Sequence, residues 1–158
     1  MTHYKALVLI GSESDRPIMN AAEPYYAYFG VEVDLVVSSA HRSPKKTAEI
    51  AASARKNGYS AIVCGAGMAA HLAGVCAAYS DLPVLGVPLP GGVQDGLDAL
   101  LSTVQMPSGA PVATFAVGKA GAINAAVFVA SIIALHDDDV RLRLEKFIEA
   151  GRRLPEKT

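Results

Sequence analysis

Residues 31–44, VEVDLVVSSAHRSP, decide the fold of this chain. The apolar, β-branched residues Val31–Val37 predict a β-strand. Ser43-Pro44 is typical of the start of a helix, because a hydroxyl suits the N-cap and proline suits the first helical position. His41 and Arg42 therefore lie on a short loop between the end of a strand and the start of a helix.

The same alternation of strand and helix continues along the whole chain. Apolar strands are predicted at residues 5–10, 31–37, 61–64, 84–87 and 114–117, and helices at 15–29, 44–57, 69–78, 94–103, 120–135 and 138–152. Continuous apolar strands separated by helices predict a parallel sheet that is covered on both faces. The expected fold class is therefore α/β: a three-layer α/β/α sandwich, flavodoxin-like, with a five-stranded parallel sheet in a single domain over residues 1–158. The amphipathic last helix packs either on its own sheet or on a neighbouring subunit, and the sequence leaves both open.

Length and composition favour one globular domain that has neither nucleic acid nor a membrane as a partner. The chain has 158 residues, of which 51% are hydrophobic, which argues against disorder. Its net charge of −1 provides no basic surface for nucleic acid and no polybasic patch for a membrane. The apolar segment 120–135 contains Asn124 and is shorter than the ~18–20 residues of a membrane span, so we expect a buried helix there. Because the N-terminus has no features of a signal peptide, the expected location is the cytoplasm.

The sequence contains no pattern that indicates a metal or a cofactor. Cys64 and Cys76 have neither CxxC nor metal-ligand spacing, and we expect buried, reduced thiols. No cluster of histidine and carboxylate residues has metal spacing. Gly118-Lys119 does not complete a phosphate loop, and no Gly-x-Ser-x-Gly elbow is present.

The site of a sheet of this kind is expected at the edge where its strands have their carboxyl ends. The loops expected at that edge are residues 11–15, 38–43, 65–71, 88–95 and 118–119. His41 and Arg42 are the strongest candidates for chemistry among them. Histidine exchanges protons near neutral pH, and a forked guanidinium fits a phosphate. The alternatives are a structural histidine and a surface ion pair.

The first of these loops carries Ser12, Ser14 and Asp15. The N-terminus of a helix binds phosphate through its free N–H groups, and a carboxylate there can hold sugar hydroxyls. Taken by itself, however, this loop favours the alternative in which Ser14 and Asp15 cap the helix.

The third loop, Gly65-Ala66-Gly67-Met68-Ala69-Ala70, matches the loose GxGxx(G/A) pattern of dinucleotide sites. The match is weak, because the loop follows the third strand and no acidic residue ends the next strand to bind a ribose. A close approach of the backbone to a flat or carboxylated ligand is the better interpretation. His71 either lines this pocket or begins the next helix, and the second interpretation is slightly favoured.

Five motifs, in this order and at these separations, resemble one family over nearly the whole chain. They are Gly11-Ser12-x-Ser14-Asp15, Ser39-Ala40-His41-Arg42-x-Pro44, Gly65-Ala66-Gly67-x-Ala69-Ala70-His71-Leu72, Gly96-x-Asp98-x-Leu100-x-Ser102-x-Val104-Gln105-Met106-Pro107-x-Gly109 and Gly118-Lys119-Ala120-Gly121-x-x-Asn124-Ala125-Ala126. The chain resembles the class I N5-carboxyaminoimidazole ribonucleotide mutases, the PurE-type proteins of purine biosynthesis.

The resemblance implies an isomerase that moves a carboxylate from the exocyclic nitrogen of an aminoimidazole ribonucleotide to ring carbon 4, by decarboxylation and recarboxylation. It implies no ATP, metal or biotin, and a homo-octamer with sites between subunits. It makes His41 the general acid/base. The substrate-binding residues that it implies are Ser12, Ser39 and Arg42 for the phosphate, Asp15 for the ribose, Ser14 and the backbone of Gly65, Ala66, Gly67 and Ala70 for the carboxylate or CO2, and His71 and Leu72 at the pocket.

Three other functions remain open. A sister class carboxylates aminoimidazole ribonucleotide directly with CO2, but its third loop reads Ala-Gly-Arg-Ser-Asn, and residues 65–71 contain no arginine. A non-catalytic, flavodoxin-like nucleotide-binding module would not need His41. A related carboxylase of pyridine-type cofactors has an additional N-terminal region, which this chain is expected to lack. The loop of residues 87–94 is richer in proline and glycine than the usual Pro-x-Gln-Ser form of the family, so its contacts are the least safe to transfer.

Overall fold

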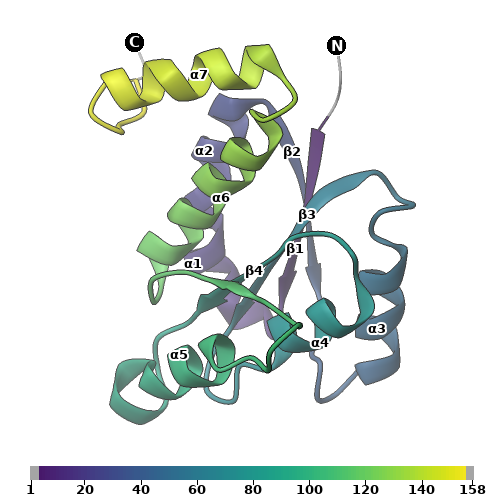
Figure 1. The fold of residues 1–158 in the computed structure, drawn as a ribbon. Helices are drawn as coiled ribbons and strands as arrows, with labels where there is room; N and C mark the ends of the chain where they lie inside the picture. The colour runs from purple at the N-terminus through teal and green to yellow at the C-terminus, as the bar shows by residue number, and fades with distance from the viewer. Residues whose placement is uncertain (1–3, 156–158) are drawn as a thin grey trace.

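A parallel sheet lies at the centre of the molecule, with helices on both of its faces (Figure 1). The computed structural model describes residues 4–155. Its strands are β1 (Tyr4–Ile10), β2 (Val31–Val37), β3 (Tyr59–Ala66), β4 (Val84–Pro88) and β5 (Ala113–Thr114). They are ordered β2-β1-β3-β4-β5, and every neighbouring pair is parallel. The predicted five-stranded α/β sandwich is therefore confirmed.

The helices form two layers that flank this sheet. One layer contains α1 (Arg16–Met19), α2 (Glu23–Phe29) and α6 (Lys119–Ile133). The other contains α3 (Pro44–Ser53), α4 (Leu72–Tyr79) and α5 (Leu97–Val104). Short 3-10 turns are η1 (Glu13–Asp15), η2 (Asn20–Ala22) and η3 (Val93–Asp95).

Each central strand contributes to two hydrophobic cores. In β1, Val8 and Ile10 pack under the layer of α2 and α6, whereas Leu7 and Leu9 pack under the layer of α3 and α4. All four side chains are 3% exposed or less. Burial on both faces explains why these strands are continuous apolar runs rather than alternating ones.

The observed elements differ from the predicted ones mainly at their ends. The first helix is not continuous over residues 15–29: it is divided by η2, which ends two residues before Pro24, and proline has no N–H to donate to the preceding turn. The helix predicted from residue 94 begins at Leu97, because Gln94 and Asp95 have positive φ values. β5 is shorter than predicted.

The last helix, α7 (Asp138–Glu149), packs on its own chain. Phe147 is buried, and its ring centroid lies 5.4 Å from that of Phe29 in α2. Leu142 and Ile148 remain exposed on the same helix. Although α7 packs against α2, the side of α7 that faces away from the protein therefore carries exposed apolar side chains.

Cys64 in β3 and Cys76 in α4 are free and buried, as predicted. The neighbouring Cys76 thiol and burial raise the pKa of the Cys64 thiol well above its ordinary value. The reactive thiolate is thus disfavoured. None of the helices within residues 4–155 combines the length and the apolar character that a membrane span requires.

Replacing Gly121 by alanine should destabilise the fold strongly. A Cβ atom at this position in α6 would lie 1.7 Å from the backbone oxygen of Ala116. Because a backbone atom cannot move aside cheaply, we expect Gly121→Ala to lower the free energy of unfolding by about 3 kcal/mol. Urea denaturation followed by circular dichroism measures this change.

Gly74→Ala in α4 is the matched control. There the added Cβ would meet the flexible end of Met106, at 3.2 Å from its Sδ atom. Alanine is favoured over glycine inside a helix by about 1 kcal/mol, so this variant should be at least as stable as the wild type. Equal denaturation midpoints for the two variants would contradict the close approach at Gly121.

Candidate functional site

A cleft of about 480 Å³ opens where the strands have their carboxyl ends. It is lined by the loops that follow β1, β2, β3 and β4, which is the placement that the sequence predicts. The lining residues are Gly11, Ser12, Ser14, Asp15, Ser39, Ala40, His41, Arg42, Ala66, Gly67, Met68, Ala69, Leu72, Pro90, Gly91 and Gly92.

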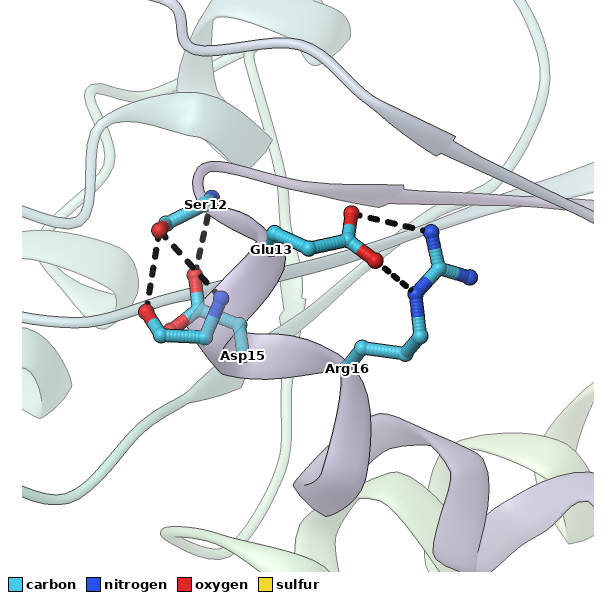
Figure 2. A network of polar contacts seen from close by, with 5 residues as sticks. Ser12, Glu13, Asp15 and Arg16 are labelled. Atoms are coloured by element: carbon cyan, nitrogen blue, oxygen red, sulfur yellow. Dashed lines mark hydrogen bonds and ion pairs between the residues drawn. The ribbon is translucent and has the colours of Figure 1, made fainter.

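The loop after β1 is held in shape by a capping box (Figure 2). The Ser12 hydroxyl accepts a hydrogen bond from the Ser14 N–H at 3.4 Å, and the Asp15 carboxylate accepts one from the Ser12 N–H at 3.1 Å. The Ser14 hydroxyl also donates to the Ser12 hydroxyl at 2.9 Å. The capping interpretation of this loop is therefore confirmed for Asp15, and all three side chains also line the cleft.

Asp15 is the half-buried carboxylate of this loop. Burial raises the pKa of its carboxyl, and the hydrogen bond from the Ser12 N–H acts in the opposite direction. The exposed Glu13 beside it is instead paired with Arg16, whose Nη2 atom donates to it at 3.0 Å. Arg16 is thereby occupied outside the cleft, and the cation that lines the cleft comes from the next loop.

The loop after β2 is closed by its own hydrogen bonds. The Ser39 hydroxyl accepts from the Arg42 N–H at 3.2 Å, and the Ser39 carbonyl accepts from the Ser43 N–H at 2.8 Å. Ser43 occupies the N-cap of α3 as predicted, but its hydroxyl makes no capping hydrogen bond. Below the loop, the buried Ser38 and Thr47 hydroxyls share a hydrogen bond of 2.8 Å.

The imidazoles of His41 and His71 are in direct contact. The Nε2 atom of His41 lies 2.9 Å from the Nδ1 atom of His71, and the two rings are nearly perpendicular at 85°. A hydrogen bond between two ring nitrogens requires one to carry a proton and the other to accept it. His71 does begin α4, at its N-cap, but its side chain caps nothing there and is directed to His41 instead.

The loop after β3 contributes mainly backbone to the cleft. Met68 has a φ of 55°, in the left-handed region that non-glycine residues rarely adopt. Of the predicted residues, Ala66, Gly67 and Leu72 line the cleft, whereas Gly65, Ala70 and His71 do not. Gly65 is buried, and a Cβ there would lie 2.6 Å from the Sδ atom of Met19, so packing already requires this glycine.

The loop after β4 also reaches the cleft, in agreement with its expected place at this edge of the sheet. Pro90, Gly91 and Gly92 all line the cleft. The Gly91 N–H donates to Asp95 and the Val93 N–H to Asp98, each at 3.0 Å. The predicted loop at Gly118-Lys119 does not line the cleft.

No metal centre accompanies this cleft in the part of the chain that the structure describes. Among residues 4–155, no three histidine, cysteine, aspartate or glutamate side chains gather closely enough to hold an ion. The arrangement combines an imidazole pair, a half-buried carboxylate, hydroxyls and a guanidinium. Such a set can move a proton on a ligand that also carries an anionic group.

Comparison with known proteins gives a consistent result. A family model described as AIR carboxylase matches residues 5–153. A protein of Vibrio parahaemolyticus named N5-carboxyaminoimidazole ribonucleotide mutase is 46% identical over 143 residues, covering 90% of this chain and 89% of that protein. A protein of Escherichia coli with the same name is 45% identical over 146 residues, covering 92% and 86%.

A solved structure has the same fold. The crystal structure of Treponema denticola PurE aligns with a TM-score of 0.85 at 22% sequence identity, covering 95% of this chain and 92% of that one. This likeness supports the architecture described above.

The Arg42 guanidinium should bind anions at the cleft. Within residues 4–155 no carboxylate is paired with it, whereas Arg55 is paired with Asp81 at 2.8 Å. Because a hydrogen bond to a charged group is a strong one, we expect Arg42→Ala to weaken the binding of inorganic phosphate about tenfold. Titration followed by ³¹P NMR measures this, with Arg55→Ala as the control that leaves binding unchanged. Equal effects of the two variants would show that Arg42 is not the anion-binding cation.

Proposed function

The chain belongs to the AIR carboxylase family, and we propose from this membership that it is an N5-carboxyaminoimidazole ribonucleotide mutase of purine biosynthesis. Such an enzyme is an isomerase: it moves a carboxylate from the exocyclic nitrogen of the substrate to ring carbon 4. The observation that carries the proposal is the position of His41, an imidazole held by a second imidazole in a cleft that also offers Arg42. The 45–46% identity to proteins of that name supports the same reaction.

We propose that the ligand is a nucleotide whose parts are held by different loops. Arg42, Ser12 and Ser39 hold the phosphate, since they offer a guanidinium and two hydroxyls. Asp15 holds the ribose hydroxyls as a carboxylate acceptor. The backbone of Ala66 and Gly67, together with Ser14, faces the carboxylate and the CO2 formed from it. All of these residues line the one cleft.

The proton balance of this reaction requires one group that both gives and takes a proton. Cleavage of the N–CO2 bond leaves CO2 and a nitrogen that takes up a proton. The enamine-like carbon 4 then attacks CO2, forms the C–C bond and loses its own proton. We propose that His41 donates the first proton and accepts the second, so that it ends the cycle as it began. The cleft keeps CO2 close to carbon 4 between the two steps.

Direct carboxylation of aminoimidazole ribonucleotide with CO2 is the second candidate. The description of the matching family model, AIR carboxylase, is the observation that favours it. Against it, the loop after β3 has no arginine where the carboxylase class has one. The two reactions differ in the substrate that the enzyme accepts, so a direct assay separates them.

The purified protein should convert N5-carboxyaminoimidazole ribonucleotide to the 4-carboxy product without ATP or added bicarbonate. Replacing His41 by asparagine should lower this turnover by about 10²–10⁴-fold, because the general acid/base is lost. Ligand binding should persist, since Arg42, Ser12 and Asp15 remain. Product formation followed by absorbance measures the first quantity, and calorimetric titration with aminoimidazole ribonucleotide measures the second.

His136→Asn is the control for this experiment. His136 is an exposed histidine in the turn between α6 and α7 that does not line the cleft, so its replacement should leave turnover unchanged. Product formed only from aminoimidazole ribonucleotide and bicarbonate would identify a carboxylase. Full activity of His41→Asn would instead indicate a protein that does not use this histidine.

We propose that eight copies of the chain assemble. Several helices of a single chain expose large apolar side chains, which a contact with other subunits would bury. These side chains are Leu97, Leu101 and Val104 on α5, Phe128 on α6, and Leu142 and Ile148 on α7. Sedimentation velocity should give a mass eight times the 16.4 kDa of one chain. A monomer at micromolar concentration would contradict this assembly.

We also propose that the protein works in the cytoplasm. Its two free, buried thiols are typical of a reducing compartment. Recovery of the protein outside the cytoplasmic fraction of its cells would contradict this location.

A further inference from the structure

Two of the loops that line the cleft have their shape fixed from outside the cleft, by helix α5. We propose that Ser102 and Asp98 on α5 are positioning residues for the reaction: they hold the loops that follow β3 and β4 in the geometry that the substrate meets. Neither side chain lines the cleft, so both act through the backbone of other residues. This inference rests on the mutase function proposed above.

Ser102 holds the loop after β3. Its hydroxyl accepts a hydrogen bond from the Ala70 N–H at 2.9 Å and lies 3.2 Å from the carbonyl of Met68. It also lies 2.7 Å from the carbonyl of Asp98, one turn earlier in α5. A hydroxyl has one proton, so it donates to one carbonyl at a time while it accepts from Ala70. The hydroxyl thus connects α5 to both ends of the loop segment of residues 68–70.

The segment that Ser102 holds has an unusual backbone, in which the Ala70 N–H also lies 2.9 Å from the Met68 carbonyl. It contains Met68, whose backbone is left-handed and whose side chain is 65% exposed. A non-glycine residue in this region costs about 1 kcal/mol or more, and persists where the surroundings determine it. Two side chains of α5 contact Ala70: its N–H donates to the Ser102 hydroxyl at 2.9 Å, and its carbonyl lies at 3.5 Å from the Thr103 hydroxyl.

Asp98 holds the loop after β4 in a comparable way. Its Oδ2 atom accepts from the Val93 N–H at 3.0 Å, and its Oδ1 atom accepts from the Ala99 N–H at 2.9 Å. The carboxylate also lies against the backbone of Gly92, where a Cβ atom would be 2.4 Å from Oδ2. Gly92 lines the cleft, so the carboxylate of Asp98 packs directly behind the cleft wall.

The two contacts form one unit. Asp98 and Ser102 are four residues apart on α5, and the Ser102 hydroxyl lies within hydrogen-bond distance of the Asp98 carbonyl. Between them they reach Ala70 on one loop and Val93 on the other. These two loops would contact the ligand mainly through their backbone. Their contribution to binding and turnover therefore depends on where the backbone lies rather than on their side chains. A displacement of 1 Å in such a wall can cost about 10²-fold in rate.

Ser102→Ala tests this role by its effect on kcat and KM. We expect kcat for the carboxylate migration to fall about tenfold, because the wall beside the reacting carboxylate loosens. KM should change less than about twofold, since the phosphate and ribose contacts proposed above come from the loops after β1 and β2. Ser102→Thr keeps the hydroxyl and should recover most of the lost kcat.

Ser131→Ala is the matched control. Ser131 on α6 has the same kind of hydrogen bond to the carbonyl four residues earlier, at 3.0 Å from Val127, but no contact with a cleft loop. It should leave kcat and KM unchanged. An unchanged kcat in Ser102→Ala, or an equal loss in both variants, would overturn the positioning role.

Amide hydrogen exchange, read by mass spectrometry, tests the contact itself without any substrate. In Ser102→Ala, peptides that cover residues 66–71 should exchange faster than in the wild type, and in Ser131→Ala they should not. Unchanged exchange in Ser102→Ala would overturn the proposal even if its activity were low. If instead the wild type shows no mutase activity, the proposed function fails, and faster exchange in Ser102→Ala would still establish that α5 holds this loop.

Discussion

The parallel direction of the strands is the constraint on which the site depends. Because β1, β2, β3 and β4 all run the same way, the loops that follow them meet at one edge of the sheet. Residues from distant parts of the sequence, from Ser12 to Gly92, thereby line one cleft. The strands are buried on both faces of the sheet, so the loops stand on a packed core. The loops can therefore carry different functional groups without a change in the sheet.

The loops after β1, β2 and β4 pair some of their backbone N–H groups with side chains that are close in sequence. Asp15 accepts from the N–H of Ser12, Ser39 from that of Arg42, Asp95 from that of Gly91, and Asp98 from that of Val93. Polar residues in the cleft region are therefore of two kinds, those that face the ligand and those that shape the loops. Asp15 shapes its loop and also lines the cleft, so its capping hydrogen bond is compatible with the ribose contact proposed above.

The sequence was sufficient to predict the fold and the place of the site, because both follow from local patterns. The β-branched run of Val31–Val37 and the helix start at Ser43-Pro44 define the loop that carries His41, and each is readable over a few residues. The contact between His41 and His71 was not predictable, since it joins residues 30 apart through the packing of α4 on β3. The contacts of Asp98 and Ser102 with the neighbouring loops were not predictable for the same reason. They depend on where α5 packs, which no local sequence pattern specifies. The division of the first helix at η2, two residues before Pro24, was not predicted.

The short distance between Gly92 and the Asp98 carboxylate also limits which residues can replace Gly92 in evolution. A residue with a side chain at position 92 would require the carboxylate at position 98 to withdraw, and the Val93 N–H would then lose its acceptor. Loss of the carboxylate at position 98 would remove this contact, but Gly92 would still have a φ of 69°, which disfavours any residue with a side chain. Related chains are therefore expected to keep glycine at position 92 wherever the loop after β4 keeps this course, with or without the carboxylate at position 98.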